Sequence, residues 1–211
     1  GQTEGNLYDG GFLQDIDANP KLIYSKNGLP DRQDLKALLA AAQEADLKKR
    51  QAKLEELLDI ERFLSYLCLE VIFHDWDGYP LNRNNFRIYH DVKRNKIVFI
   101  PSGMDQMYGD IHLAVRPPFN GLVARAYVEI PEGKEKYYQR MKHIVATVYK
   151  PQERVRRLEE LSKFLNESVQ KYDKGLAQDI PSQINRLKQA IPERGKIIER
   201  QIQEREARMK K

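Results

Sequence analysis

The chain has a single cysteine among its 211 residues, and this scarcity excludes two classes of site. One thiol cannot form an internal disulfide, and it cannot build a zinc site made of several cysteines. Cys68 falls inside a helical apolar pattern, which favours a buried thiol that behaves as a small apolar side chain. The cysteine content therefore leaves the redox compartment open.

Long apolar runs are also missing. A membrane-spanning helix needs about 20 apolar residues in a row, and no segment approaches that length. The start has no positively charged segment followed by an apolar stretch, as a secretory signal would have. We therefore expect a soluble chain without a membrane span, whose cellular address stays open because an upstream signal can be removed. With 41% hydrophobic residues, the chain is long enough for one compact domain.

Several familiar catalytic motifs are absent. The sequence contains no Walker phosphate loop, dinucleotide fingerprint, Gly-x-Ser-x-Gly elbow or His-Glu-x-x-His pair. The four histidines lie on different segments, and no two are four residues apart, so a zinc site built on histidine is not favoured. His74 leaves two interpretations open. It can orient Asp75 or Asp77, or it can lie at a helix end, where the dipole favours positive charge.

The net charge of +5 belongs to the C-terminal part of the chain. Residues 151–211 hold 15 Lys/Arg against 10 Asp/Glu, which leaves 21 of each sign among residues 1–150. The signs alternate closely, as in residues 153–160, and this is typical of exposed helix faces with ion pairs between neighbouring turns. The pattern favours a solvated helical surface over a phosphate-binding stripe, so nucleic-acid binding is the least favoured function.

The apolar spacing predicts an α+β fold that is mainly α. Residues 35–42 fit a helix capped by Asp31, and residues 54–58 lead into a second helix. That second helix, over residues 60–73, has apolar positions around most of its circumference. We therefore expect it to be the central, buried helix of the domain.

A β-hairpin and a helical tail complete the predicted fold. Residues 86–89 and 97–100 fit two short strands joined by a turn at 93–96. Beyond Pro118 the pattern is helical throughout. The expected helices are 118–128, 132–149, 151–174, which Gly175 would end, and 181–210, with Pro181 in its first turn; residues 151–211 form the helical tail.

The first thirty residues fit loops better than a folded core. Residues 5–11 are glycine-rich and turn-like, and the short apolar piece 22–24 is followed by turn residues at 27–30. A domain seldom begins with loops that have no core of their own. We therefore expect residues 1–211 to be a single domain that is a fragment of a larger fold.

Polar side chains concentrate between the central helix and the hairpin. Residues 75–85 contain two acids and three asparagines, which are Asp75, Asp77, Asn82, Asn84 and Asn85. A loop that only reverses the chain needs far fewer polar side chains. The two short strands of the hairpin would also bring residues 82–85 and 103–105 to the same end.

Asp77, Asn82 and Asp105 are the candidate residues for chemistry. Two carboxylates about 4 Å apart repel by about 4 kcal/mol at an effective dielectric constant near 20, so their clustering calls for a cation. Mg²⁺ accepts carboxylate and amide oxygens and fills its other positions with water and phosphate. Asp77 and Asn82 have the Asp-x-x-x-x-Asn spacing of a protein-kinase catalytic loop, where the Asp orients the attacking hydroxyl and the Asn holds metal. Asp105 would be the second metal ligand.

The same residues are compatible with a structural role. Asparagine and aspartate form turns and cap helices, and Asn84 and Asn85 can satisfy backbone donors before the strand. The residues alone leave the metal–phosphate site and the turn interpretation both open.

Three segments together resemble the CotH kinase family, which is named for spore coat protein H. They are His-Asp-Trp-Asp-Gly-Tyr at 74–79, Asn-Arg-Asn-Asn-Phe-Arg-Ile-Tyr at 82–89, and Ile-Pro-Ser-Gly-Met-Asp at 100–105 followed by Gly109. The family pattern has an Asp, then Asn-x-Asn-Asn-aromatic before a strand, then Ile-Pro-Trp-Asp-x-Asp. Gly-Asn-Leu-Tyr at 5–8 is similar to the Gly-x-Leu-Tyr segment of the family.

The resemblance implies the C-terminal lobe of a protein-kinase-like fold that transfers phosphate from ATP to serine or threonine of a protein. By that resemblance Asp77 is the catalytic aspartate, Asn82 and Asn85 bind the nucleotide, and Asn82 and Asp105 bind Mg²⁺ or Mn²⁺. The implied partner is a Ser/Thr-rich protein substrate such as a coat protein. The implied location is exported, at the cell surface or on the spore.

Two departures from an active kinase accompany the resemblance. Ser102 and Gly103 stand where the family has Trp-Asp, so one of two acidic positions is missing. Nothing before Asp31 has the strands or the glycine-rich pattern of an ATP-covering lobe, so we expect that lobe upstream and weak or absent activity for these residues alone. The alternative is a catalytically dead kinase-like module that binds a protein partner.

Overall fold

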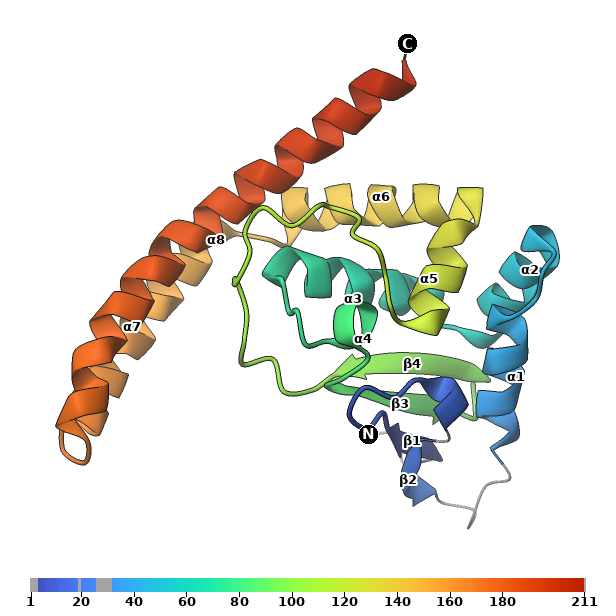
Figure 1. Cartoon of the computed structure of the whole chain (residues 1–211), viewed down its shortest axis with the longest axis horizontal. Coiled ribbons are helices and arrows are strands. Elements are labelled where there is room, and N and C mark those ends of the chain that lie inside the picture. The colour runs from blue at the N-terminus through green and yellow to red at the C-terminus, as the bar shows by residue number, and fades with distance from the viewer. Residues whose placement is uncertain (1–3, 19, 26–31, 211) are drawn as a thin grey trace. The chain divides into compact units, whose positions relative to one another are not determined.

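The computed structural model describes residues 4–18, 20–25 and 32–210. These residues form a mainly helical α+β structure, as predicted from the sequence, and its strands make a four-stranded antiparallel sheet (Figure 1). The strands are β1 (Gly5–Asp9), β2 (Lys21–Ser25), β3 (Phe86–Asp91) and β4 (Lys96–Pro101). The helices are the 3₁₀ turn η1 (Ile16–Ala18), α1 (Gln33–Ala42), α2 (Leu47–Leu57), α3 (Ile60–Phe73), α4 (Tyr79–Asn82), α5 (Leu122–Glu129), α6 (Pro131–Thr147), α7 (Pro151–Val169) and α8 (Lys174–Met209).

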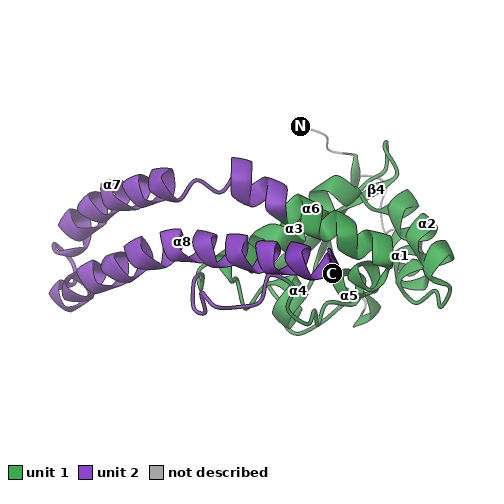
Figure 2. Cartoon of the chain, turned by 90° about the horizontal axis from the view of Figure 1, so that it is seen from above, with its two compact units in different colours: residues 1–107, 116–141 green, residues 108–115, 142–211 purple. Residues whose placement is uncertain are grey.

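The chain divides into two compact units (Figure 2). The first comprises residues 1–107 and 116–141 and contains the sheet. The second comprises residues 108–115 and 142–211 and contains α7 and α8. No helix among the described residues combines the length and the apolarity that crossing a membrane requires.

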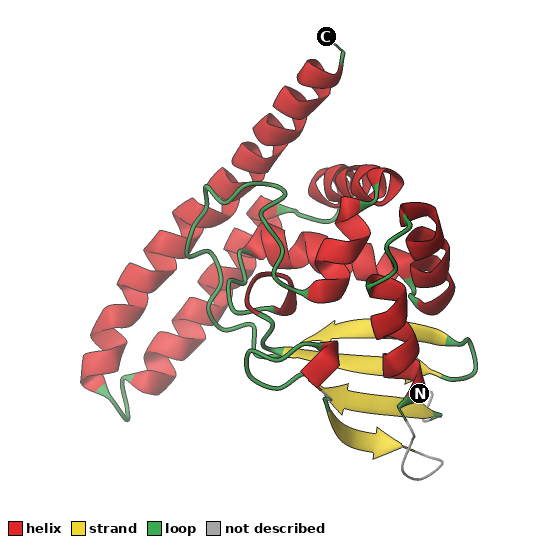
Figure 3. Cartoon of the chain, turned by 45° about the vertical axis from the view of Figure 1, so that its right-hand side comes forward, coloured by secondary structure: helices red, strands yellow, loops and turns green. Residues whose placement is uncertain are grey.

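The sheet of the first unit has the order β2-β1-β3-β4, with every neighbouring pair antiparallel (Figure 3). The predicted hairpin is present as β3 and β4. The expectation of loops before residue 31 is wrong, because residues 5–9 and 21–25 form β1 and β2. Gly5 shows why the pattern was misleading: a Cβ there would lie 2.3 Å from the carbonyl oxygen of His90, so the glycine permits close strand pairing and makes no turn.

Helix α3 is the buried central helix that its apolar spacing predicts. It begins after Asp59, whose side chain accepts a hydrogen bond from the Arg62 amide, and it packs on the sheet through aromatic rings. The ring centroids of Phe63 and Phe99 are 5.1 Å apart, and those of Tyr79 and Phe99 are 4.8 Å apart. This packing holds the first turns of α3 and the start of α4 against β4, so the polar stretch lies between two anchored segments.

The segment before α3 forms a separate helix, α2, although residues 54–58 were expected to lead directly into the central helix. Asp46 caps α2 by accepting a hydrogen bond from the Lys49 amide at 2.9 Å, and Asp59 then caps α3. Two capping aspartates therefore separate α2 from the central helix. Asp31, the expected cap of the first helix, lies outside the described residues.

The two long helices of the second unit differ from the expected ones. The sequence pattern predicts that the first tail helix ends before Gly175 and that the last helix begins at Pro181. Instead, Asp173 caps α8 by accepting from the Leu176 amide at 2.9 Å, so the helix already includes Gly175 and continues through Pro181 and Pro192. Packing against α7 within this unit compensates for the backbone bonds that each proline removes. Helix α7 buries none of its residues, in agreement with its alternating charges.

Packing inside the second unit explains Gly195, which interrupts an otherwise regular helical pattern. A Cβ at this position would lie 3.2 Å from the ring of Tyr149, which is itself buried. The neighbouring Arg194 is fully buried and donates to the carbonyl oxygens of Ile111 and Leu113 at 2.8 and 2.6 Å. Tyr149 is thus a core residue of this unit.

Candidate active site

The polar stretch after α3 folds as a tight backbone structure with one short helix. Helix α3 ends at Phe73, and the next residue, His74, caps it with a left-handed φ of 46°. The Asp75 amide then donates to the Glu70 carbonyl at 2.9 Å, and the Gly78 amide donates to the Asp75 carbonyl at 3.1 Å. Helix α4 follows, with Pro80 in its first turn. His74 therefore lies at a helix end, one of its two predicted placements.

Three asparagine amides converge on the carboxylate of Asp77. Asn82 donates to Oδ1 at 2.7 Å, and Asn84 and Asn85 each donate to Oδ2 at 2.9 Å. All four side chains are half-buried. The three amides hold the carboxylate in one orientation, because each of them donates to one of its two oxygens. Asn84 was not among the predicted site residues, although its place in the Asn-x-Asn-Asn sequence was a usable signal.

The end of β4 reaches the same cluster through Asn85. Its side-chain amide also donates to the Gly103 carbonyl at 3.3 Å, and its own carbonyl accepts from the Ser102 amide at 2.8 Å. Gly103 has a left-handed φ of 64°, and a Cβ there would lie 3.0 Å from Asn85 Oδ1. The position where the family carries an acidic residue is therefore shaped for glycine in this chain.

Asp105 lies within electrostatic reach of the cluster. Its amide donates to the Gly103 carbonyl at 2.9 Å, and its side chain is exposed. Burial raises the pKa of Asp75 to about 6, and the negative charges of Asp77 and Asp105 add to this shift. The two loops are also joined directly, since the Trp76 indole donates to Gln106 Oε1 at 3.2 Å. The structure thus brings Asp77, Asn82, Asn85 and the Asp105 loop together at one end of the hairpin.

The donor set suits a hard divalent cation with several waters. Asp105 offers a carboxylate, and Asn82 offers its Oδ1 while its amide nitrogen bonds Asp77. Mg²⁺ is commonly held by one or two carboxylates with water and phosphate completing its shell. Among residues 4–18, 20–25 and 32–210, no three His, Cys, Asp or Glu side chains are arranged to hold a metal. An all-protein metal cage is therefore not what this arrangement offers.

Two further acids lie beneath the cluster, and the sequence pattern did not single them out as a pair. Glu70 is 1% exposed and Asp75 is 0% exposed. Burial and the neighbouring Asp75 raise the pKa of Glu70 to about 9. A glutamate within the apolar stripe of α3 was the available signal, because an ionisable residue at a core position needs an explanation.

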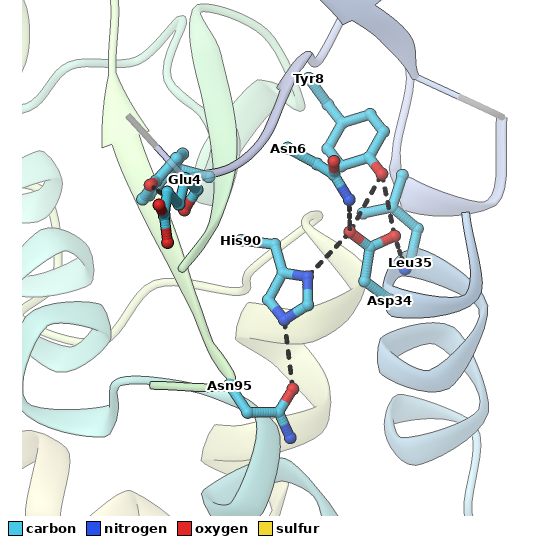
Figure 4. Close-up of polar contacts among 8 residues, drawn as sticks. Glu4, Asn6, Tyr8, Asp34, Leu35, His90 and Asn95 are labelled. Atoms are coloured by element: carbon cyan, nitrogen blue, oxygen red, sulfur yellow. Dashed lines mark hydrogen bonds and ion pairs between the residues drawn. The ribbon is translucent and has the colours of Figure 1, made fainter. Parts of the chain in front are cut away.

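His90 belongs to a separate polar cluster around Asp34 (Figure 4). Asp34 accepts hydrogen bonds from Asn6, from Tyr8, from the Leu35 amide and from His90 Nδ1, at 2.8 to 3.1 Å. Burial by itself would raise the pKa of Asp34, but these bonds lower it to about 2. This cluster ties α1 to β1 and β3.

The family model described as CotH kinase protein matches residues 4–198.

The chain belongs to the CotH kinase family.

A curated relative is Invasin CotH3 of Rhizopus delemar (strain RA 99-880 / ATCC MYA-4621 / FGSC 9543 / NRRL 43880), which is 31% identical over 81 residues. The match covers 38% of this chain and 13% of the invasin, so this CotH chain spans a small part of that relative. The family predicted from the motifs at 74–79, 82–89 and 100–109 is confirmed, and the family match extends through the helices beyond residue 110.

Proposed function

We propose that this CotH chain carries the catalytic centre of a protein kinase that transfers the γ-phosphoryl group of ATP to serine or threonine of a protein. The observation that supports it best is the Asp77 carboxylate, held by three asparagine amides beside the Asp105 loop. The order of catalytic aspartate, metal-binding asparagine, strand, turn, strand and second aspartate is the order of the kinase site.

Each residue has a distinct task in the proposed reaction. Asp77 orients the substrate hydroxyl and takes its proton while the oxygen bonds to the γ-phosphorus and the bond to the leaving ADP breaks. Asn82 and Asp105 would hold Mg²⁺ or Mn²⁺, and Asn85 would contact the nucleotide phosphates. The bound cation supplies neutralisation of phosphate charge. The asparagine amides prevent rotation of the Asp77 carboxylate, so placement provides most of the catalysis.

The expected substrate is a Ser/Thr-rich protein, and the expected setting is outside the cell. The matched relative is named an invasin, and the family is named for a spore coat protein. We therefore propose an exported or surface-associated location for the protein.

Asp77→Ala in the full-length protein tests the proposal. We expect loss of a proton acceptor at the reacting hydroxyl to reduce transfer about 10²–10⁴-fold. The measurement is transfer of label from [γ-³²P]ATP to the protein itself or to a Ser-rich substrate. Asp179→Ala, an exposed aspartate on α8, is the matched control and should transfer normally. Unchanged transfer by Asp77→Ala would remove Asp77 from the mechanism.

A second function is supported by Gly103. Because this position has lost the acidic residue of the family pattern, the chain could be a kinase-like module that binds a protein partner without catalysis. Titration calorimetry with Mg²⁺-ATP on a longer chain separates the two functions. Absence of binding heat together with absence of label transfer would favour the non-catalytic module.

A further inference from the structure

Glu70 and Asp75 form a buried acid pair with few hydrogen-bond donors around it. None of the four carboxyl oxygens receives a well-formed hydrogen bond from the described residues. The Tyr66 hydroxyl lies beside Glu70, and Tyr79 lies near Tyr66. Asp77 and Asp105 face Asp75 and add negative charge. Among the described residues, the largest influences on the pKa values of the two carboxyl groups include no lysine, arginine or histidine.

A single proton shared between the Glu70 and Asp75 carboxyl groups removes the repulsion between them. Two buried carboxylates would repel each other without compensation, whereas a protonated carboxyl donates a strong O–H···O⁻ bond to an ionised one. Burial first and then Asp75 raise the pKa of Glu70 to about 9, while that of Asp75 rises only to about 6. The proton therefore resides on Glu70 at neutral pH.

The pair forms the floor of the loop that carries Asp77. A Cβ on Gly78 would lie 1.9 Å from Glu70 Oε2, so the carboxyl packs directly against the Gly78 backbone. The Gly78 amide donates to the Asp75 carbonyl at 3.1 Å, and its carbonyl accepts from the Asn82 amide at 2.8 Å. A change at Glu70 is therefore transmitted to the backbone on both sides of Asp77.

We propose that Glu70 donates its carboxyl proton to Asp75 and is thereby a positioning residue for Asp77. The positioning role rests on the proposed kinase function, whereas the protonation of Glu70 does not. Ionisation of Glu70 would place a second charge under Gly78 and displace the loop. Glutamine at position 70 keeps the donor and the shape but cannot ionise, so it is the variant that isolates the proton.

The first measurement is the unfolding constant of the full chain in urea, from pH 5.5 to pH 8.5, for the natural protein and for Glu70→Gln. Because the folded state holds one proton on Glu70 that the unfolded chain releases near pH 4.5, raising the pH favours unfolding of the natural protein more than unfolding of Glu70→Gln. We expect the ratio of the two unfolding constants to change about tenfold per pH unit. A ratio that stays constant across this range would overturn the proposal.

The second measurement uses Trp76, the single tryptophan of the chain, which lies next to Asp77. We expect its emission to shift in the natural protein between pH 7 and pH 9.5 as Glu70 ionises, and to stay constant in Glu70→Gln. Glu70→Leu, which removes the donor, should show the shifted emission already at pH 7. If Glu70→Leu does not fold, the glutamine comparison still decides. Identical emission profiles for the natural protein and Glu70→Gln would overturn the positioning role, whatever the outcome of the label-transfer assay.

Discussion

The sheet-containing unit buries carboxyl groups in two opposite ways. The side chain of Asp34 is 5% exposed and accepts hydrogen bonds from four surrounding donors, which lower its pKa to about 2. Glu70 and Asp75 are at least as buried and receive no comparable donors, and their pKa values rise to about 9 and 6. The same chemical group is thus stabilised as an anion in one place and disfavoured as an anion in the other.

The difference separates a structural acid from acids beside the proposed catalytic site. A buried charge with every lone pair satisfied ties α1, β1 and β3 together and benefits the fold (Figure 4). A buried pair whose strongest donor is one of its own two carboxyl groups lowers stability, and such features persist mainly beside sites that need them. The unsatisfied pair lies directly under Asp77, which supports the site assignment independently of the family match.

Asp34→Ala gives the largest expected effect. The substitution leaves His90, Tyr8 and Asn6 with buried donors and no acceptor, and breaking a buried charged pair typically costs about 3–5 kcal/mol. Urea denaturation at pH 7 measures the loss in the free energy of unfolding. Asp17→Ala, at an exposed position, should change it by about 0.5 kcal/mol or less. A loss at Asp34 no larger than at Asp17 would contradict a structural role for this cluster.

The same substitution, aspartate to asparagine, should act in opposite directions at the two clusters. Asp34→Asn removes a charge that its donors stabilise and should lower stability by about 2 kcal/mol. Asp75 has a raised pKa, so its ionised form costs stability above pH 6, and Asp75→Asn should raise stability at pH 7.5 by about 1–2 kcal/mol. Urea denaturation of both variants at pH 7.5 checks this. Shifts of the same sign would remove the distinction between the clusters.

The parts of the molecule that follow local rules could be predicted from sequence. The 3.6-residue spacing of α3, the turn between β3 and β4, and the Asp-x-x-x-x-Asn spacing each depend on residues close together in the chain. The site residues Asp77, Asn82 and Asn85 come together for the same reason, since one helical turn and one strand start connect them.

The parts that depend on distant contacts could not be predicted. β1 pairs with β3 across about 80 residues, and Gly5 was ambiguous until its contact with His90 was known. The bond from His90 to Asp34 spans 56 residues, and helix α8 continues through Pro181 because α7 packs along it. The Glu70 and Asp75 pair forms because the backbone at Gly78 packs against the Glu70 carboxyl on α3, and residue spacing in the sequence does not predict this contact.

His90→Gln gives the smallest of the three effects and tests the satisfied cluster by its pH dependence. The hydrogen bond to Asp34 raises the pKa of His90. Stability from the protonated histidine is therefore complete below its ordinary pKa near 6.5 and is lost as the pH rises through the higher folded-state pKa. The natural protein should exceed His90→Gln in free energy of unfolding at pH 6 by an amount on the order of 1 kcal/mol or less. Melting curves measure the difference as a higher melting temperature of the natural protein, and this difference should shrink toward pH 9.

The comparison of His90→Gln with the natural protein isolates the effect of His90. Both proteins keep Glu70, so the stability that each loses as Glu70 ionises cancels in the difference between them. The double variant His90→Gln/Glu70→Gln should therefore change the free energy of unfolding by the sum of the two single changes. The two clusters share none of the hydrogen-bond partners described for them. A melting difference that stays constant from pH 6 to pH 9 would mean that His90 is not charged in the folded protein. The Asp34 cluster would then be held by neutral hydrogen bonds rather than by an ion pair.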